Sequence, residues 1–247
     1  VIQQRQAYAY KFFQIPASRP KVYLDESGFH LHVAKRRKGR AMAGYTPQLT
    51  LMPKGNNTSL LASLLSTGPG YHKFVDSRGE TKRGVNSNDF LIYLHELRAQ
   101  LPLKAVVIMD NAAIHHTAEV EDYLETIKKA YGVDVLFLPP YSPFLNPIEY
   151  MFAKIKLLVR QSQFANRAEL KSRIEDALQQ ITMEEAQAWY DHAARYLPQC
   201  LAGMPFSGKP LQPDFVEITI PQSSHTPFPA PPQPTPLLAL PAPSPSS

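Results

Sequence analysis

The feature that most constrains the fold is a run of five apolar residues, AVVIM, at positions 105–109. A continuously apolar run of this length is typical of a strand buried on both faces of a sheet. Apolar residues recur at helical spacing on both sides of it, which predicts helices over residues 87–101 and 118–131. The run therefore predicts an α/β fold, with a mixed sheet flanked by helices.

The other predicted elements extend this pattern to about residue 204. Strands are predicted at residues 21–24, 30–34, 59–65, 71–75 and 133–138, and helices at 147–161, 167–180 and 183–196. Residues 205–247 contain 13 of the 24 prolines, a composition that blocks helices and central strands. We therefore expect an N-terminal helix or linker at 1–20, a core domain at 21–165, packed helices at 166–204 and a disordered tail at 205–247.

Composition limits the classes of protein that this chain can represent. The single cysteine, Cys200, excludes an internal disulfide and favours a reducing compartment. No run of 18 apolar residues predicts a membrane-spanning helix, so no membrane partner is expected. The net charge of +5 is compatible with a polyanionic partner. A basic run containing Lys35, Arg36 and Arg37 is either a solvated loop or a phosphate contact.

Three acids stand where the predicted elements would bring them together. Asp25 and Asp110 each follow a predicted strand, and Glu149 begins a helix that is entered from the loop after a third strand. Ligands gather at the carboxyl ends of strands in such sheets. Carboxylates prefer hard cations, so the three acids could hold two Mg²⁺ or Mn²⁺ ions for phosphodiester chemistry. No obvious nucleophilic side chain is nearby, which favours direct in-line attack.

Two of the three acids, and two basic residues near the third, also have a structural interpretation. Asp25 could simply end a strand in a turn. Glu149 could complete a capping box with Asn146 as the N-cap. Lys156 and Arg160 share a helix face with Glu149, so they could follow a DNA backbone or could be solvated surface charges.

The histidines are less informative. We expect His115 to lie beside the site rather than to bind a metal. His30 and His32 alternate on a predicted strand, but no further ligands at matching spacing support a zinc site.

Three segments together resemble the catalytic domain of Tc1/mariner and IS630-like transposases, members of the DDE superfamily of endonucleases. They are VYLDESGF (22–29), VVIMDNAAIHH (106–116) and LPPYSPFLNPIEYMF (138–152), of which the proline-rich third is the most specific. The 38 residues between Asp110 and Glu149 slightly exceed the usual interval, and Phe152 stands where many relatives have Trp.

The resemblance implies an RNase H-like fold, two divalent cations, and hydrolysis followed by strand transfer on double-stranded DNA, at transposon ends and at the target. It implies that Asp25, Asp110 and Glu149 are the catalytic, metal-binding acids. The adjacent residues Glu26, Asn111, His115 and Asn146 are expected to lie around them. A homodimer is also implied. The helix-turn-helix pair that reads transposon ends is expected to lie outside this chain.

Two other functions remain open at this point. The chain could be an inactive or domesticated transposon-derived DNA-binding or scaffold protein, or an RNase H-like nuclease that cleaves RNA–DNA hybrids. The basic run and the tail predict a nuclear location in a eukaryotic host, and otherwise the cytoplasm or nucleoid is expected.

Overall fold

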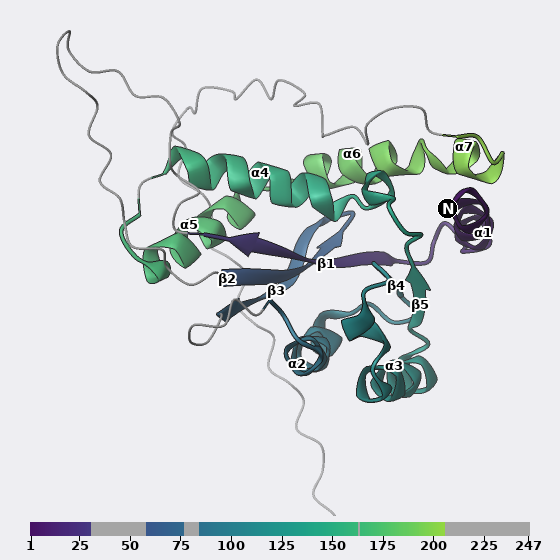
Figure 1. The fold of residues 1–247 in the computed structure, drawn as a ribbon, viewed down its shortest axis with the longest axis horizontal. Coiled ribbons are helices and arrows are strands. Elements are labelled where there is room, and N and C mark those ends of the chain that lie inside the picture. The colour runs from purple at the N-terminus through teal and green to yellow at the C-terminus, as the bar shows by residue number, and fades with distance from the viewer. Residues whose placement is uncertain (31–57, 77–83, 163, 206–247) are drawn as a thin grey trace, which may run out of the picture. The chain divides into compact units, whose positions relative to one another are not determined.

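The computed structural model describes residues 1–30, 58–76, 84–162 and 164–205 (Figure 1). The described strands are β1 (Lys21–Phe29), β2 (Thr58–Leu65), β3 (Gly68–Asp76), β4 (Val106–Met109) and β5 (Asp134–Phe137). The described α-helices are α1 (Ile2–Phe13), α2 (Ser87–Leu97), α3 (Ala118–Tyr131), α4 (Ile148–Gln161), α5 (Arg167–Gln179), α6 (Met183–Ala194) and α7 (Leu197–Leu201). Short 3₁₀ helices are η1 (Arg98–Gln100), η2 (Ala113–His116) and η3 (Pro143–Leu145).

The five strands form one mixed sheet in the order β3-β2-β1-β4-β5. β1 pairs antiparallel with β2, and β2 pairs antiparallel with β3. On its other side β1 runs parallel to β4, which in turn runs parallel to β5. The predicted mixed sheet is therefore confirmed, and β1 is its central strand.

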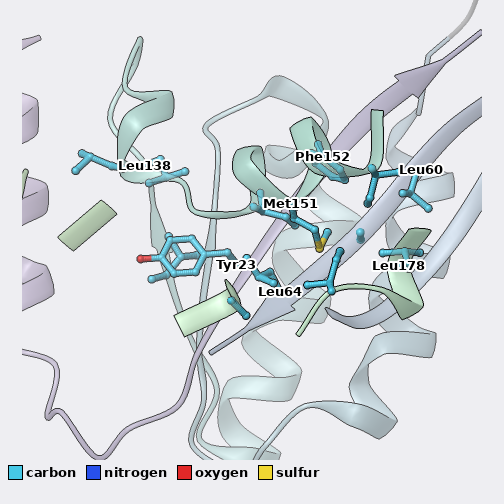
Figure 2. Packing of buried hydrophobic residues seen from close by; sticks show 14 of the residues in the cluster. Tyr23, Leu60, Leu64, Leu138, Met151, Phe152 and Leu178 are labelled. Carbon is cyan, nitrogen blue, oxygen red and sulfur yellow. The ribbon is translucent and has the colours of Figure 1, made fainter. Parts of the chain in front are cut away.

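Helices cover both faces of the sheet (Figure 1). One apolar cluster joins Tyr23 and Leu60 to the buried face of α4 and to α5 and α6. Figure 2 shows Met151 and Phe152 of α4 in this cluster with Leu64 of β2. The second cluster lies between the opposite face and helices α2 and α3. The run 105–109 is buried because its side chains alternate between the two clusters.

The α4 helix follows the predicted apolar stripe. Its buried residues are Ile148, Met151, Phe152, Ile155 and Val159, which recur at intervals of three and four. This stripe fixes how α4 is rotated against the sheet, and hence the direction in which Glu149 points.

Several predicted boundaries were wrong. The strand starting at residue 21 does not stop before Asp25, because antiparallel pairing with β2 carries it on to Phe29. The helix predicted over 87–101 is α-helical only to Leu97 and then tightens into η1. The helix predicted over 118–131 does have these bounds as α3, and Gly132 ends it with a φ of 68°. Its N-cap residue, Thr117, makes no side-chain capping hydrogen bond.

Some predictions concern residues outside the described ranges. Residues 31–34 of the predicted strand at 30–34, the basic residues Lys35, Arg36 and Arg37, and the tail from 206 onward all lie there. Among the described helices, none is long and apolar enough to cross a bilayer.

Candidate active site

Asp25 and Asp110 come level with each other on adjacent parallel strands. The last paired residues of β1 and β4 are Tyr23 and Ile108, so two residues further along each chain lie Asp25 and Asp110. Asp25 is still within β1, opposite Ala62 of β2, whereas Asp110 is the first residue after β4. The parallel register of this strand pair therefore brings together acids that are 85 residues apart in the sequence.

The third acid arrives through the loop after β5. Leu138 donates its N–H to the Met109 carbonyl at 2.8 Å, and the chain then leaves the sheet at Pro139 and Pro140. One 3₁₀ turn, η3, leads to Asn146 and Pro147, and Glu149 stands in the first turn of α4.

Asn146 binds Asp25 instead of capping α4. Its Nδ2 donates to Asp25 Oδ2 at 2.8 Å, and no side-chain cap bond forms at the start of α4. The capping-box interpretation of Glu149 was therefore wrong. A bond between residues 121 positions apart ties the third motif directly to the first.

The three acids line one cleft of about 350 Å³. The rest of its lining comes mainly from the segment 138–146, together with Asn111 and Ala112. The predicted convergence of Asp25, Asp110 and Glu149 is therefore present in the fold.

Burial and mutual repulsion act on these carboxylates. Burial, followed by the negative charge of Glu149, raises the pKa of Asp25 to about 8, although the backbone N–H of Glu26 opposes this. Burial also raises the pKa of Glu149, with a further contribution from Asp110 and an opposing one from Lys156. Carboxylates held this close disfavour each other's ionisation, a cost that a bound cation would remove.

Asp110 is the exception, because a histidine supports its charge. The His115 Nδ1 lies 3.0 Å from Asp110 Oδ1, and this hydrogen bond is the main cause of a lowered Asp110 pKa. His115 is buried and packs against the ring of Phe90, with centroids 4.2 Å apart. The structure thus places His115 beside the site, as the sequence predicted.

Of the other residues predicted to lie around the acids, Asn111 lines the cleft and Glu26 does not. Asn111 lines the cleft and its Oδ1 lies 2.6 Å from His116 Nε2. Glu26 does not line the cleft, since side chains alternate along β1 and it points to the face opposite Asp25. Burial is the main cause of its raised pKa.

Lys156 lies near the carboxylates on α4. Its Nζ sits 5.8 Å from the centre of the Phe29 ring. Burial lowers its pKa, while the charges of Glu149 and Asp25 raise it. Arg160 is exposed further along the same helix.

The donor set suits a hard divalent cation. It consists of oxygens only: the three carboxylates, and the buried Asn146 Oδ1, which has no hydrogen-bond partner among the described residues. In the described part of the chain, no three acidic, histidine or cysteine side chains converge closely enough to hold one ion as they stand. Both oxygens of Asp25 are engaged, by Glu26 N and Asn146 Nδ2, and Asp110 faces His115. Cation binding would therefore require these side chains to rearrange.

Sequence reasoning missed the residues that hold the loop itself. Tyr141 and Ser142 line the cleft, and Arg5 of α1 donates hydrogen bonds to both. The motif that contains Tyr141 and Ser142 was recognised, but nothing local in the sequence pairs it with a residue 136 positions earlier.

Comparison with known proteins places the fold. Residues 20–171, more than half of the chain, match the family model described as DDE superfamily endonuclease. A search of curated proteins found no match. The Mos1 strand transfer complex has a TM-score of 0.65 and 21% identity, covering 83% of this chain and 62% of that one. The Mos1 mariner paired end complex with Mn has a TM-score of 0.64 and 21% identity, covering 81% and 61%.

The catalytic domain of Mos1 mariner transposase has a TM-score of 0.61 and 19% identity, covering 83% of this chain and 93% of that domain. The chain thus spans about three fifths of the Mos1 chains in the complexes and nearly all of the isolated catalytic domain. These likenesses confirm the RNase H-like fold. Because the matched family segment contains all three clustered acids, the chain belongs to the DDE superfamily of endonucleases.

Proposed function

We propose that this chain is the catalytic part of a mariner-like transposase, which cuts DNA at transposon ends and joins them to a target. The observation that carries the proposal is the meeting of Asp25, Asp110 and Glu149 in one cleft that also lies beside Lys156. One similar Mos1 structure is a paired-end complex with a transposon end, another is a strand transfer complex, and a third is a paired end complex with Mn. They support transposon-end DNA and a divalent cation as ligands of this chain, and strand transfer as part of its reaction.

Asp25, Asp110 and Glu149 would hold two Mg²⁺ or Mn²⁺ ions. Such ions activate an attacking water or 3′-hydroxyl and stabilise the leaving oxygen of the phosphodiester. The protein's own residues keep the acids in place: Asn146 holds Asp25, and His115 holds Asp110 in its charged form.

Lys156 and Arg160 would bind the phosphates that follow the scissile bond along α4. We include Lys35, Arg36 and Arg37 as further phosphate contacts on charge alone. A dimer that pairs two DNA ends is part of the proposal, and the description of a similar Mos1 structure as a paired end complex supports it.

A nicking assay tests the function. Supercoiled plasmid carrying matched terminal repeats is incubated with the chain and Mg²⁺ or Mn²⁺, and open-circular product is measured. We expect nicking that EDTA abolishes and that falls at least about 100-fold in Asp110→Asn, because one cation ligand is lost. Salt-sensitive DNA binding without any nicking would instead identify a non-catalytic DNA-binding protein. Cleavage of RNA–DNA hybrids alone would identify a hybrid nuclease.

A further inference from the structure

An arginine from the N-terminal helix holds the loop that shapes the cleft. Arg5 of α1 donates from Nη2 to the Tyr141 carbonyl at 2.7 Å and from Nε to Ser142 Oγ at 2.8 Å. Its guanidinium also lies 5.1 Å from the centre of the Phe144 ring. One planar side chain therefore contacts three of the four residues in the segment 141–144.

The backbone at this point is strained. Tyr141 has a φ of 53°, in the left-handed region that a residue with a Cβ rarely occupies. The residue is 84% exposed, so packing of the ring does not hold it there. Strained backbone persists when the surroundings fix it, and it is common at functional sites. The hydrogen bond from Arg5 to the Tyr141 carbonyl is a direct restraint on this conformation.

A second place in the fold uses the same device. Among the described residues, Lys104 is the other non-glycine residue with positive φ, and its carbonyl also accepts a hydrogen bond from an arginine, Arg19. Arg19 and Lys104 lie by a different pocket, which includes none of the three acids. Arg19 and Lys104 therefore provide a control. Loss of the Arg19 hydrogen bond removes a restraint on a strained carbonyl without touching the active site.

Arg5 is supported by a well-packed helix. Tyr8 and Ala9, three and four positions later on α1, are buried in the core cluster shared with α4. The arginine is therefore anchored to the core rather than free to follow the loop.

Hydrogen bonds connect the segment held by Arg5 to the acids of the active site. Leu145 and Asn146 donate their N–H groups to the carbonyls of Ser142 and Pro143, at 3.0 and 2.9 Å, which forms η3. The Asn146 side chain then binds Asp25, and Glu149 N donates to the Asn146 carbonyl at 3.2 Å. Arg5 thus stands at one end of a chain of contacts that ends on two of the acids.

We propose that Arg5 is a positioning residue for the active site: it fixes the loop 141–146 so that Asn146 and Glu149 face Asp25. The family model begins at residue 20, so α1 lies outside the segment that it matches. The inference rests on the proposed function for its effect on cleavage, but its effect on the loop is independent of that function.

The first measurement is amide hydrogen exchange at Leu145 and Asn146, in the full chain without metal or DNA. In Arg5→Ala we expect both amides to exchange about tenfold faster, the effect of losing roughly one hydrogen bond's net stabilisation. Arg19→Ala is the matched control: it should speed exchange around residue 104 and leave Leu145 and Asn146 unchanged. Unchanged exchange at these two amides in Arg5→Ala would overturn the proposal.

The second measurement is Mn²⁺-dependent nicking. Arg5→Ala should nick about 10- to 100-fold more slowly, as expected when reacting groups lose their alignment, while Arg19→Ala should keep the wild-type rate. Arg5→Lys keeps the charge but not the two-pronged donor, so it should also be slow, and a wild-type rate there would contradict the proposal. Millimolar guanidinium should restore part of the Arg5→Ala rate, whereas NaCl at equal ionic strength should not.

Failure of the proposed function and failure of a variant to fold can both be told apart from failure of the inference. If the wild-type chain does not nick DNA, the proposed function fails, and hydrogen exchange alone decides the role of Arg5. If Arg5→Ala does not fold, the same exchange and nicking measurements are made on Arg5→Lys. Wild-type behaviour of that variant in both would overturn the inference.

Discussion

Asn146 Nδ2 donates a hydrogen bond of 2.8 Å to Asp25 Oδ2, across 121 positions of sequence. The bond leaves Asn146 Oδ1 buried and without a partner among the described residues, next to the acids. A buried polar atom of this kind is uncommon in proteins and is often explained by a ligand or ion. Asn146 is thus both a brace for Asp25 and a candidate ligand in its own right.

Replacement of Asn146 should damage cleavage more than stability. We expect Asn146→Ala to lower Mn²⁺-dependent nicking by about 10- to 100-fold, because Asp25 loses its alignment with the other two acids. Asn166→Ala is a matched control, since Asn166 Oδ1 accepts the Glu169 N–H at 2.9 Å as the N-cap of α5, away from the cleft. It should cost about 1 kcal/mol of stability, measured by urea unfolding, and leave nicking unchanged. Equal nicking by both variants would exclude the bracing role.

Metal binding should appear as thermal stabilisation. Burial and the neighbouring acids raise the pKa values of Asp25 and Glu149, so a cation relieves a cost that the folded chain carries. Saturating Mn²⁺ at about 100 times its Kd should add about 2.7 kcal/mol, or several degrees in Tm.

The variant Glu149→Gln tests whether Glu149 is one of the residues that bind the cation. It should lose most of the Mn²⁺ shift, yet melt no lower than the wild type in EDTA, because it removes one of the repelling charges. Glu119→Gln, an exposed acid in the first turn of α3, is the control and should keep the full shift. A Mn²⁺ shift of wild-type size in Glu149→Gln would argue against Glu149 as a ligand.

Acid sensitivity is predicted at Asp76, the last residue of the edge strand β3. Burial alone would raise the Asp76 pKa, but hydrogen bonds from Lys171 and Thr58 and the charge of Arg167 lower it overall. The folded chain then binds fewer protons at Asp76 than the unfolded chain does, so stability rises with pH in this range. The contribution is complete above the unfolded pKa of about 4 and is lost as pH falls through the folded value.

Urea unfolding between pH 2 and pH 6 checks this sign. At pH 6 we expect Asp76→Asn to be less stable than the wild type by about 1 kcal/mol, a modest value because the ion pairs are partly exposed. The difference should shrink as the pH falls towards 2 and the wild-type carboxylate becomes protonated. A difference that is constant with pH would show that the charge of Asp76 contributes nothing.

The sequence predicted the fold best where local pattern and tertiary environment agree. The run 105–109 reads as a buried strand and is one, since both of its faces meet apolar clusters. The acids Asp110 and Glu149 were placed correctly because each sits at the end of a strongly patterned element.

Prediction failed where a distant partner decides the structure. The continuation of β1 past Asp25 depends on its pairing with β2. The Asn146 side chain forms a hydrogen bond with Asp25 and does not cap α4. Local propensity favoured a turn and a cap at these positions, and tertiary contacts overrode it. The role of Arg5 has no local signal at all, because its partners are more than 130 residues away.

DNA binding should depend on Lys156 of α4 and not on Lys154, two positions earlier on the same helix. Lys156 lies near Glu149 and Asp25, while Lys154 Nζ is held 2.6 Å from Glu185 Oε1 of α6. We expect Lys156→Gln to weaken binding to all DNA sequences about equally and to reduce the slope of log K against log salt by about 1, as loss of one phosphate contact does. Lys154→Gln should instead lower the stability of α4 against α6 and leave the salt slope unchanged. Fluorescence anisotropy over a range of NaCl concentrations measures both slopes, and an unchanged slope in Lys156→Gln would place the DNA backbone elsewhere.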